Sequence, residues 1–264
     1  MKLAFIGCGN MGGAILCTAI KHGALKAEDA VVFDRNPRGR GTALAANVSV
    51  TQTLLEAVRG ADMIVLAVKP KDAAAAIKEA GVTLEGKALL SIVAGLSYAE
   101  INSALGKVKA RVLVTMPNMP ILVGCGCTGF TKETTFSQQE RKTAEALFGS
   151  LGIVEWVSEN KLFAFSAIAG SSPAFTAMYI EALADAAVLE GLSRNAAYRV
   201  VSQAVMGSAR LISETEMHPA IIKDSVSSPG GMTIEGVKTL EKGGFRGIVM
   251  SAFGASAQKF FRLH

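Results

Sequence analysis

A glycine-rich stretch near the N-terminus limits the possible folds more than any other part of the sequence. Gly7-Cys8-Gly9-Asn10-Met11-Gly12 follows a short apolar run at residues 2–6, and helical periodicity continues from it to His22. A glycine string means little alone, but between a strand and a helix it is typical of a dinucleotide-binding turn. An apolar run that ends in Asp34 lies about twenty residues further on, as that turn requires.

Each glycine of this turn has a separate predicted task. Gly7 permits the tight turn, Gly9 lets the main chain approach a pyrophosphate, and Gly12 lets the helix pack close to the strand. The free N–H groups at the start of the helix favour an anion. The cofactor contacts predicted here are Gly7, Gly9, Asn10, Met11 and Gly12.

The residues after the second predicted strand give conflicting indications about the cofactor. Asp34 would accept hydrogen bonds from ribose hydroxyls and repel an added phosphate, whereas Arg35 would pair with that phosphate and stack on adenine. Both are predicted cofactor contacts, and neither indication prevails. The predicted cofactor is NADPH with NADH possible, and the preference between them stays open. Arg38 and Arg40 are interpreted as the solvated start of the next helix.

The rest of the N-terminal half alternates between strand and helix. Apolar runs at residues 62–68, 88–93, 111–114 and 152–156 predict strands, and residues 71–80 and 137–150 predict helices. This alternation favours a doubly wound parallel sheet of the Rossmann type, here assigned to residues 1–160. Ligands bind at the carboxyl ends of such strands. The contacts expected there are Ala67, Val68, Lys69, Pro70 and Asn118.

Residues 161–264 show only helical periodicity, so we expect an all-α C-terminal domain with about four helices. Residues 162–180 carry no charge and are long enough to cross a bilayer. Gly170-Ser171-Ser172-Pro173 in their middle argues against a membrane span, because its polar groups need partners. Several helices are apolar on more than one face, which predicts dimerisation through this domain.

A turn near the C-terminus is suited to binding a carboxylate. Ser227-Ser228-Pro229-Gly230-Gly231 precedes a predicted helix that starts near Thr233. Two adjacent glycines expose main-chain N–H groups, and the helix directs its positive end at the same place. A tight connection between two helices is the other interpretation of such a turn.

The whole chain resembles the pyrroline-5-carboxylate reductase family, which catalyses the last step of proline biosynthesis. The resemblance rests on the N-terminal glycine motif, Ala67-Val68-Lys69-Pro70, Met116-Pro117-Asn118-Met119-Pro120, Gly170-Ser171-Ser172-Pro173-Ala174, and the run from His218 to Arg246. It implies reduction of 1-pyrroline-5-carboxylate to L-proline with hydride from NAD(P)H. The family often has a neutral residue at position 34 and usually a threonine at position 119, so Asp34 and Met119 are departures.

By this resemblance, the main chain of Ser228, Gly230, Gly231 and Thr233 would bind the substrate carboxylate. The Thr233 hydroxyl would bond the ring nitrogen, and Glu216 would hold Thr233 or a water in place, so these two are the predicted catalytic residues. A homodimer, or a higher oligomer of dimers, is implied. The sequence leaves open the number of dimers and any feedback by proline.

Composition excludes other classes of function. The chain has 264 residues and a net charge of +5, but its basic residues are dispersed and its aromatic content is 6%, which disfavours nucleic acid. Four cysteines without a disulfide-like framework indicate a reducing cytoplasm. Three histidines lack ligand spacing to Cys125 and Cys127, so we expect no metal site.

Two alternatives remain at this stage. A β-hydroxyacid dehydrogenase-type NAD(P)-dependent enzyme also joins a Rossmann domain to a helical domain, but such enzymes place a lysine four residues after a glycine, where this chain has Ala174. Without a general base, hydroxyl oxidation loses roughly two to four orders of magnitude in rate. A redox-sensing NAD(P)-binding protein would not explain the carboxylate-binding turn.

Overall fold

The computed structural model describes residues 1–261, which form two compact units. The first unit is Met1–Gly170 and the second begins at Ser171. Helix α7 (Glu159–Leu189) belongs to both units, because the division falls inside it. Residue 160, where the sequence analysis expects the division, is the second residue of this helix.

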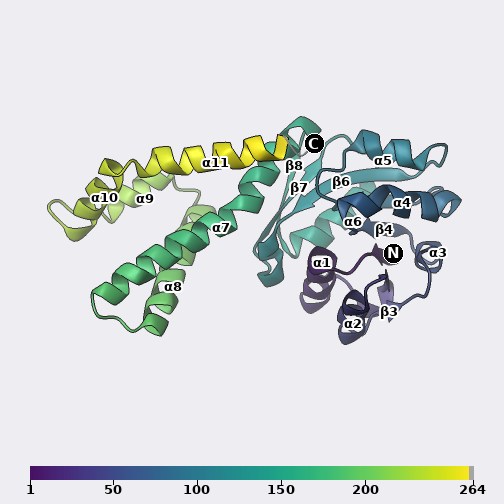
Figure 1. The fold of residues 1–264 in the computed structure, drawn as a ribbon, viewed down its shortest axis with the longest axis horizontal. Helices are drawn as coiled ribbons and strands as arrows, with labels where there is room; N and C mark the ends of the chain where they lie inside the picture. The colour runs from purple at the N-terminus through teal and green to yellow at the C-terminus, as the bar shows by residue number, and fades with distance from the viewer. Residues whose placement is uncertain (262–264) are drawn as a thin grey trace. The chain divides into compact units, whose positions relative to one another are not determined.

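Eight strands of the first unit form one sheet in the order β3-β2-β1-β4-β5-β6-β7-β8 (Figure 1). Their bounds are β1 Leu3–Ile6, β2 Ala30–Phe33, β3 Ser49–Val50, β4 Met63–Leu66, β5 Ala88–Ser91, β6 Arg111–Pro117, β7 Gly126–Thr131 and β8 Gly152–Val157. Strands β1 to β6 are parallel, which confirms the Rossmann-type prediction. Strand β7 pairs antiparallel with β6 and parallel with β8, and the sequence analysis did not foresee it.

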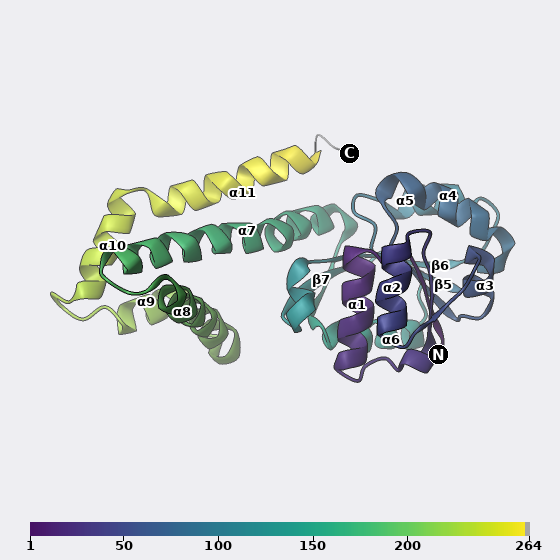
Figure 2. The same cartoon turned by 60° about the horizontal axis from the view of Figure 1, so that its bottom comes forward.

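Helices cover both faces of this sheet. They are α1 Asn10–Lys21, α2 Pro37–Ala45, α3 Leu54–Arg59, α4 Pro70–Ala80, α5 Tyr98–Leu105 and α6 Gln138–Gly149, with 3-10 turns at Ala27–Asp29, Gly81–Leu84 and Met119–Val123. One buried apolar cluster lies under α1, α2 and α6, and the other lies under α3, α4 and α5. Figure 2 shows α1 beside α2 on the first of these faces. Strands β1, β4 and β5 are buried on both sides, as expected for central parallel strands in a doubly wound sheet.

Local sequence explains where several of these helices begin. The side chain of Ser137 accepts a hydrogen bond from the Glu140 N–H, and the Glu140 carboxylate accepts one from the Ser137 N–H. The same reciprocal cap opens α3 and α5. Helices α2 and α4 begin at Pro37 and Pro70, where the missing N–H costs nothing.

The buried carboxylate of Glu140 also joins α6 to the sheet. Arg111 at the start of β6 donates to both of its oxygens at 2.7–2.9 Å. Burial alone would raise the pKa of Glu140, but the hydrogen bonds from Arg111 and Ser137 outweigh burial and lower that pKa. The same pairing raises the pKa of Arg111, so the two groups stay charged.

Two prolines lie at the end or in the interior of an element. Pro117 is the last residue of β6, opposite Thr128 of β7. Pro173 lies inside α7, which is continuous through it. A proline inside a helix leaves the carbonyl four residues earlier without its helical donor, here the carbonyl of Ala169.

The second unit is helical throughout its described residues. After α7 it contains α8 Arg194–Thr215, α9 Pro219–Ser225, α10 Met232–Lys242 and α11 Phe245–Phe261. The sequence predicted about four helices, and the short helix α9 was not foreseen. A small apolar cluster centred on Ala184, Ala197 and Val201 joins α7 to α8. By length and composition alone α7 is apolar enough to cross a membrane, and little of it is buried.

Candidate active site

The glycine-rich turn between β1 and α1 has the geometry that its residue types predict. Gly7 has a φ of +96°, and a Cβ there would lie 2.6 Å from the Ala67 carbonyl oxygen. A Cβ on Gly12 would lie 2.5 Å from the Gly7 carbonyl oxygen, whereas one on Gly9 would meet nothing within 4 Å. Gly7 and Gly12 are therefore required by packing against protein atoms. Packing against protein atoms does not require glycine at position 9. The close approach of a ligand is the remaining physical reason for a glycine there.

The start of α1 is suited to an anion. Gly9 is its N-cap without a side-chain hydrogen bond, and the first turn holds no acidic residue. Main-chain N–H groups of this turn, including those of Asn10 and Met11, therefore have no side-chain acceptor. A helix of this length directs its positive end at the same place.

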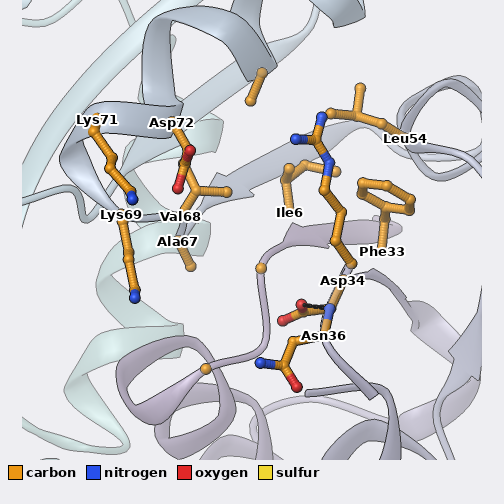
Figure 3. A pocket seen from close by; sticks show the side chains of 14 residues that line it. Ile6, Phe33, Asp34, Asn36, Leu54, Ala67, Val68, Lys69, Lys71 and Asp72 are labelled. Atoms are coloured by element: carbon orange, nitrogen blue, oxygen red, sulfur yellow. Dashed lines mark hydrogen bonds between the residues drawn. The ribbon is translucent and has the colours of Figure 1, made fainter. Parts of the chain in front are cut away.

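A cavity of about 370 Å³ adjoins this turn (Figure 3). Its lining comes from the residues at and just after the ends of β1, β2 and β4 and from helices α3 and α4: Ile6, Gly7, Gly9, Phe33, Asp34, Arg35, Asn36, Leu54, Ala67, Val68, Lys69, Lys71, Asp72 and Ala76. Figure 3 shows Lys69, Lys71 and Asp72 on one side and Asp34 and Asn36 on the other. The cavity thus combines an apolar wall with a few charged groups, which is typical of a nucleotide site.

A second cavity of about 830 Å³ continues beyond the turn, along α1 and α2. It shares Gly9, Asp34, Asn36 and residues 67–69 with the first, and adds Asn10, Lys21 and Arg38 among others. The two cavities therefore meet at the glycine-rich turn. Eight of the predicted cofactor contacts line these cavities, namely Gly7, Gly9, Asn10, Asp34, Arg35, Ala67, Val68 and Lys69. The linings do not include Met11, Gly12, Pro70 or Asn118.

The carboxylate of Asp34 is held by main-chain groups of the protein itself. Its Oδ2 accepts a hydrogen bond from the Cys8 N–H at 2.6 Å, and its Oδ1 accepts one from the Asn36 N–H at 2.7 Å. Gly39 lies against the same group, since a Cβ there would be 2.2 Å from Oδ2. Asp34 therefore fastens the glycine-rich turn to the end of β2. Its role as an acceptor for ribose hydroxyls stays a prediction.

The neighbouring cations differ in their surroundings. Arg40 donates from Nη1 to the main-chain oxygens of Asp34 and Arg35, so it stabilises this loop and is not simply solvated. Arg38 is exposed, as the sequence analysis expected. Arg35 lines the first cavity and pairs with Glu79 of α4 at 2.7 Å.

Cys8, inside the glycine-rich turn, is a neutral thiol. Burial is the main cause that raises its pKa to about 12, and Cys17 and Asp34 add to the effect. A thiolate at this position would oppose an anionic ligand, so the raised pKa keeps the turn suitable for phosphate.

Asn118, predicted to contact the cofactor, has its side chain engaged within the protein. Its Oδ1 accepts a hydrogen bond from the Cys127 N–H at 2.7 Å, and its Nδ2 donates to the Ala169 carbonyl at 2.9 Å. That carbonyl is the one that Pro173 leaves without a helical donor. Asn118 thus joins the end of β6 to β7 and α7. Any contact with a cofactor would fall to its main chain.

The predicted substrate residues lie together at the start of α10 in the second unit. The Gly231 N–H donates to the Ser228 carbonyl at 3.0 Å across Pro229 and Gly230, and Gly230 has a φ of +66°. Proline followed by a glycine with positive φ is the sequence of a type II turn. Gly231 then caps α10 without a side-chain hydrogen bond, so the N–H groups of the first turn, where Thr233 stands, stay open to a ligand.

Glu216, the other predicted catalytic residue, ends α8 in an uncommon conformation. Its φ is +54°, and its N–H donates to the Ile212 carbonyl. A left-handed non-glycine residue is strained, and such strain clusters at functional sites. Within the described residues no hydrogen bond joins Glu216 to Thr233, so their partnership stays a prediction.

Sequence reasoning missed several residues of the nucleotide cavity. Asn36, Leu54, Lys71 and Asp72 line it but belong to no motif. Asn36 followed by Pro37 was an available signal, because this pair is typical of a helix N-terminus next to a strand end. In the described part of the chain no group of three or more His, Cys, Asp or Glu residues is arranged to hold a metal.

Comparison with known proteins gives consistent results over the whole chain. The family model for pyrroline-5-carboxylate reductase dimerisation matches residues 159–263, and one for NADP oxidoreductase, coenzyme F420-dependent, matches residues 2–95. Pyrroline-5-carboxylate reductase of Escherichia coli K12 is 37% identical over 265 residues, 99% of this chain and 98% of the relative.

The fold of this chain is also similar to that of two solved structures. A pyrroline-5-carboxylate reductase from Coxiella burnetii has a TM-score of 0.92 at 31% identity, covering 99% of this chain and 98% of the other. The Plasmodium falciparum pyrroline carboxylate reductase, solved with NADP bound, has a TM-score of 0.87 at 30% identity, with coverage of 98% and 97%.

Proposed function

This chain belongs to the pyrroline-5-carboxylate reductase family, and we propose that it reduces 1-pyrroline-5-carboxylate to L-proline with hydride from NADPH, the final step of proline biosynthesis. The observation that carries this proposal is similarity above 30% identity through both halves of the chain. A β-hydroxyacid dehydrogenase has no comparable support, because Ala174 occupies the position of that group's lysine.

The first unit fits a nicotinamide dinucleotide. Gly7 and Gly12 permit the close packing of this turn, Gly9 leaves open space beside it, and the first turn of α1 offers N–H groups to a pyrophosphate. We assign the cofactor to this turn, to Asp34 and Arg35, to residues 67–70 and to Asn118. NADPH supplies the hydride when bound, and NADH is the alternative donor.

The second unit supplies what a cyclic imine carboxylate needs. We assign the carboxylate to main-chain N–H groups at Ser228, Gly230, Gly231 and Thr233, and the ring nitrogen to the Thr233 hydroxyl. A protonated imine is already a strong electrophile, so the protein has to hold and orient it more than to protonate it. Glu216 would orient Thr233 or a water.

A direct assay tests this function. Purified protein is mixed with the imine and NADPH, and then with the imine and NADH, while reduced cofactor and proline are measured. We expect loss of reduced cofactor that depends on the imine and equals the proline formed, with NADPH the better donor. No imine-dependent loss with either cofactor would reject the assignment, and reactions without imine or without protein serve as controls.

We also propose that the second unit forms a homodimer, with a higher oligomer of dimers possible. The family model that matches it describes dimerisation, and apolar side chains on its helices are exposed in the single chain. Leu189, Met206, Met232 and Met250 are each more than half exposed. Burying such a surface against a second copy removes it from water.

Light scattering tests the homodimer. It should give at least twice the mass of one chain, and a monomer at micromolar concentration would contradict the proposal.

The four cysteines are free thiols, which fits a reducing compartment, and we assign the protein to the cytoplasm on this ground. Cell fractionation checks this assignment. Recovery of the protein in the membrane fraction would contradict this assignment and would indicate that the apolar helix α7 contacts a membrane.

A further inference from the structure

An ion pair crosses from the end of β2 to α4 beside the nucleotide cavity. Arg35 lines this cavity, and its Nη2 donates to Oε2 of Glu79 at 2.7 Å. Ala76, three residues before Glu79 on α4, lines the same cavity. The side chains of Arg35 and Glu79 are 68% and 40% exposed, so solvent screens this pair and a ligand can reach the guanidinium.

Arg35 differs from the other charged groups at the end of β2 because it forms an ion pair with another element, whereas Arg38 is exposed and lines the second cavity. The Asp34 carboxylate is engaged by the N–H groups of Cys8 and Asn36. The Arg40 guanidinium is engaged by main-chain oxygens of the same loop. Among the described residues, Glu79 is the ion-pair partner of Arg35. The acid that pairs with Arg35 at this corner is therefore on α4, whereas the Asp34 carboxylate is bound by main-chain N–H groups.

We propose that Glu79 is a specificity-determining residue for the cofactor, because it competes with the extra phosphate of NADPH for the Arg35 guanidinium. This inference rests on the proposed function. A phosphate dianion offers a guanidinium more charge and more acceptor atoms than a carboxylate does, so it displaces Glu79. NADH lacks that phosphate and leaves the pair intact. Glu79 thus lowers the affinity for NADPH and leaves the affinity for NADH unchanged.

Replacing Glu79 with glutamine tests the competition in the full-length protein. An exposed ion pair contributes roughly 0.2–1 kcal/mol, which corresponds to a change in Kd of about 1.4- to fivefold. We expect Glu79→Gln to lower the Kd of NADP by about 1.4- to fivefold in calorimetry and to leave the Kd of NAD unchanged. Glu28→Gln is the matched control, because it removes the same charge from an exposed pair with Lys26.

A double-mutant cycle tests whether Glu79 affects NADP binding through Arg35. In an Arg35→Gln background, Glu79→Gln should have no further effect on either Kd. Equal changes for NADP and NAD, or weaker NADP binding, would overturn the proposal, since Glu79 would then hold Arg35 for the adenosine part that both cofactors share. Failure of the wild-type protein to bind either cofactor would reject the proposed function and this inference together.

Discussion

Replacing Thr233 with alanine is expected to lower kcat by roughly ten- to a thousandfold, the usual scale for a lost hydrogen bond that acts at the reacting group. Thr233 lies in the first turn of α10, directly after a type II turn with two glycines. Its hydroxyl has no hydrogen-bond partner in the described part of the chain, so removing it disrupts no structural contact. The affinity for NADPH should stay unchanged, because the glycine-rich turn belongs to the other unit.

Two variants make this result specific. Thr233→Ser keeps the hydroxyl and should retain most of the turnover. Thr239→Ala removes a hydroxyl from the same helix, where it donates to the Glu235 carbonyl, and it should leave kcat within a factor of about two because that bond is exposed. Steady-state kinetics at saturating NADPH provides the measurement. Unchanged kcat in Thr233→Ala would remove this residue from the mechanism.

The parts of the fold that local chemistry dictates were predictable from the sequence. Helix α6 begins after Ser137 and ends before Ser150, as predicted, because a reciprocal Ser–Glu cap defines its start. The turn at Gly7 was predictable for the same reason, since only glycine accepts its φ and the adjacent Ala67 carbonyl. In both places the deciding atoms lie within a few residues or belong to one recognised motif.

The elements that were missed depend on distant partners. Strand β7 contains Gly126 and Gly129, which weaken its strand propensity, and it exists through pairing with β6 and β8. The contact of Asn118 with Ala169 spans 51 residues, and no local pattern indicates it. Helix α9 has only seven residues, too short for a clear periodicity.

The role of Asp34 in the site also depends on a partner that is distant in the sequence. Its residue type alone indicates an acceptor for ribose hydroxyls, whereas its hydrogen bonds to the N–H groups of Cys8 and Asn36 show a brace between two loops. The Cys8 bond joins residues 26 apart. The sequence leaves the cofactor preference open. We propose that it depends on the ion pair between Arg35 and Glu79, two residues 44 positions apart in the chain.

Replacing Gly9 with alanine is expected to weaken NADPH binding by about five- to 150-fold, the binding equivalent of a steric cost of roughly 1–3 kcal/mol. A Cβ at Gly9 meets no protein atom within 4 Å, and its φ of −73° suits alanine, so the fold should be unaffected. The added methyl group would instead keep a pyrophosphate from the N–H groups of α1. Thermal unfolding and calorimetry on the same sample separate stability from binding.

Alanine variants of two other glycines serve as controls for the Gly9→Ala prediction. Gly12→Ala should lower the melting temperature as well, because its Cβ would lie 2.5 Å from the Gly7 carbonyl oxygen. Gly41→Ala, inside α2 and without any atom within 4 Å, should change neither binding nor turnover and should stabilise α2 slightly. Normal NADPH affinity in Gly9→Ala would show that the cofactor's phosphates do not approach this turn, and the assignment of the α1 N-terminus to the pyrophosphate would then be wrong.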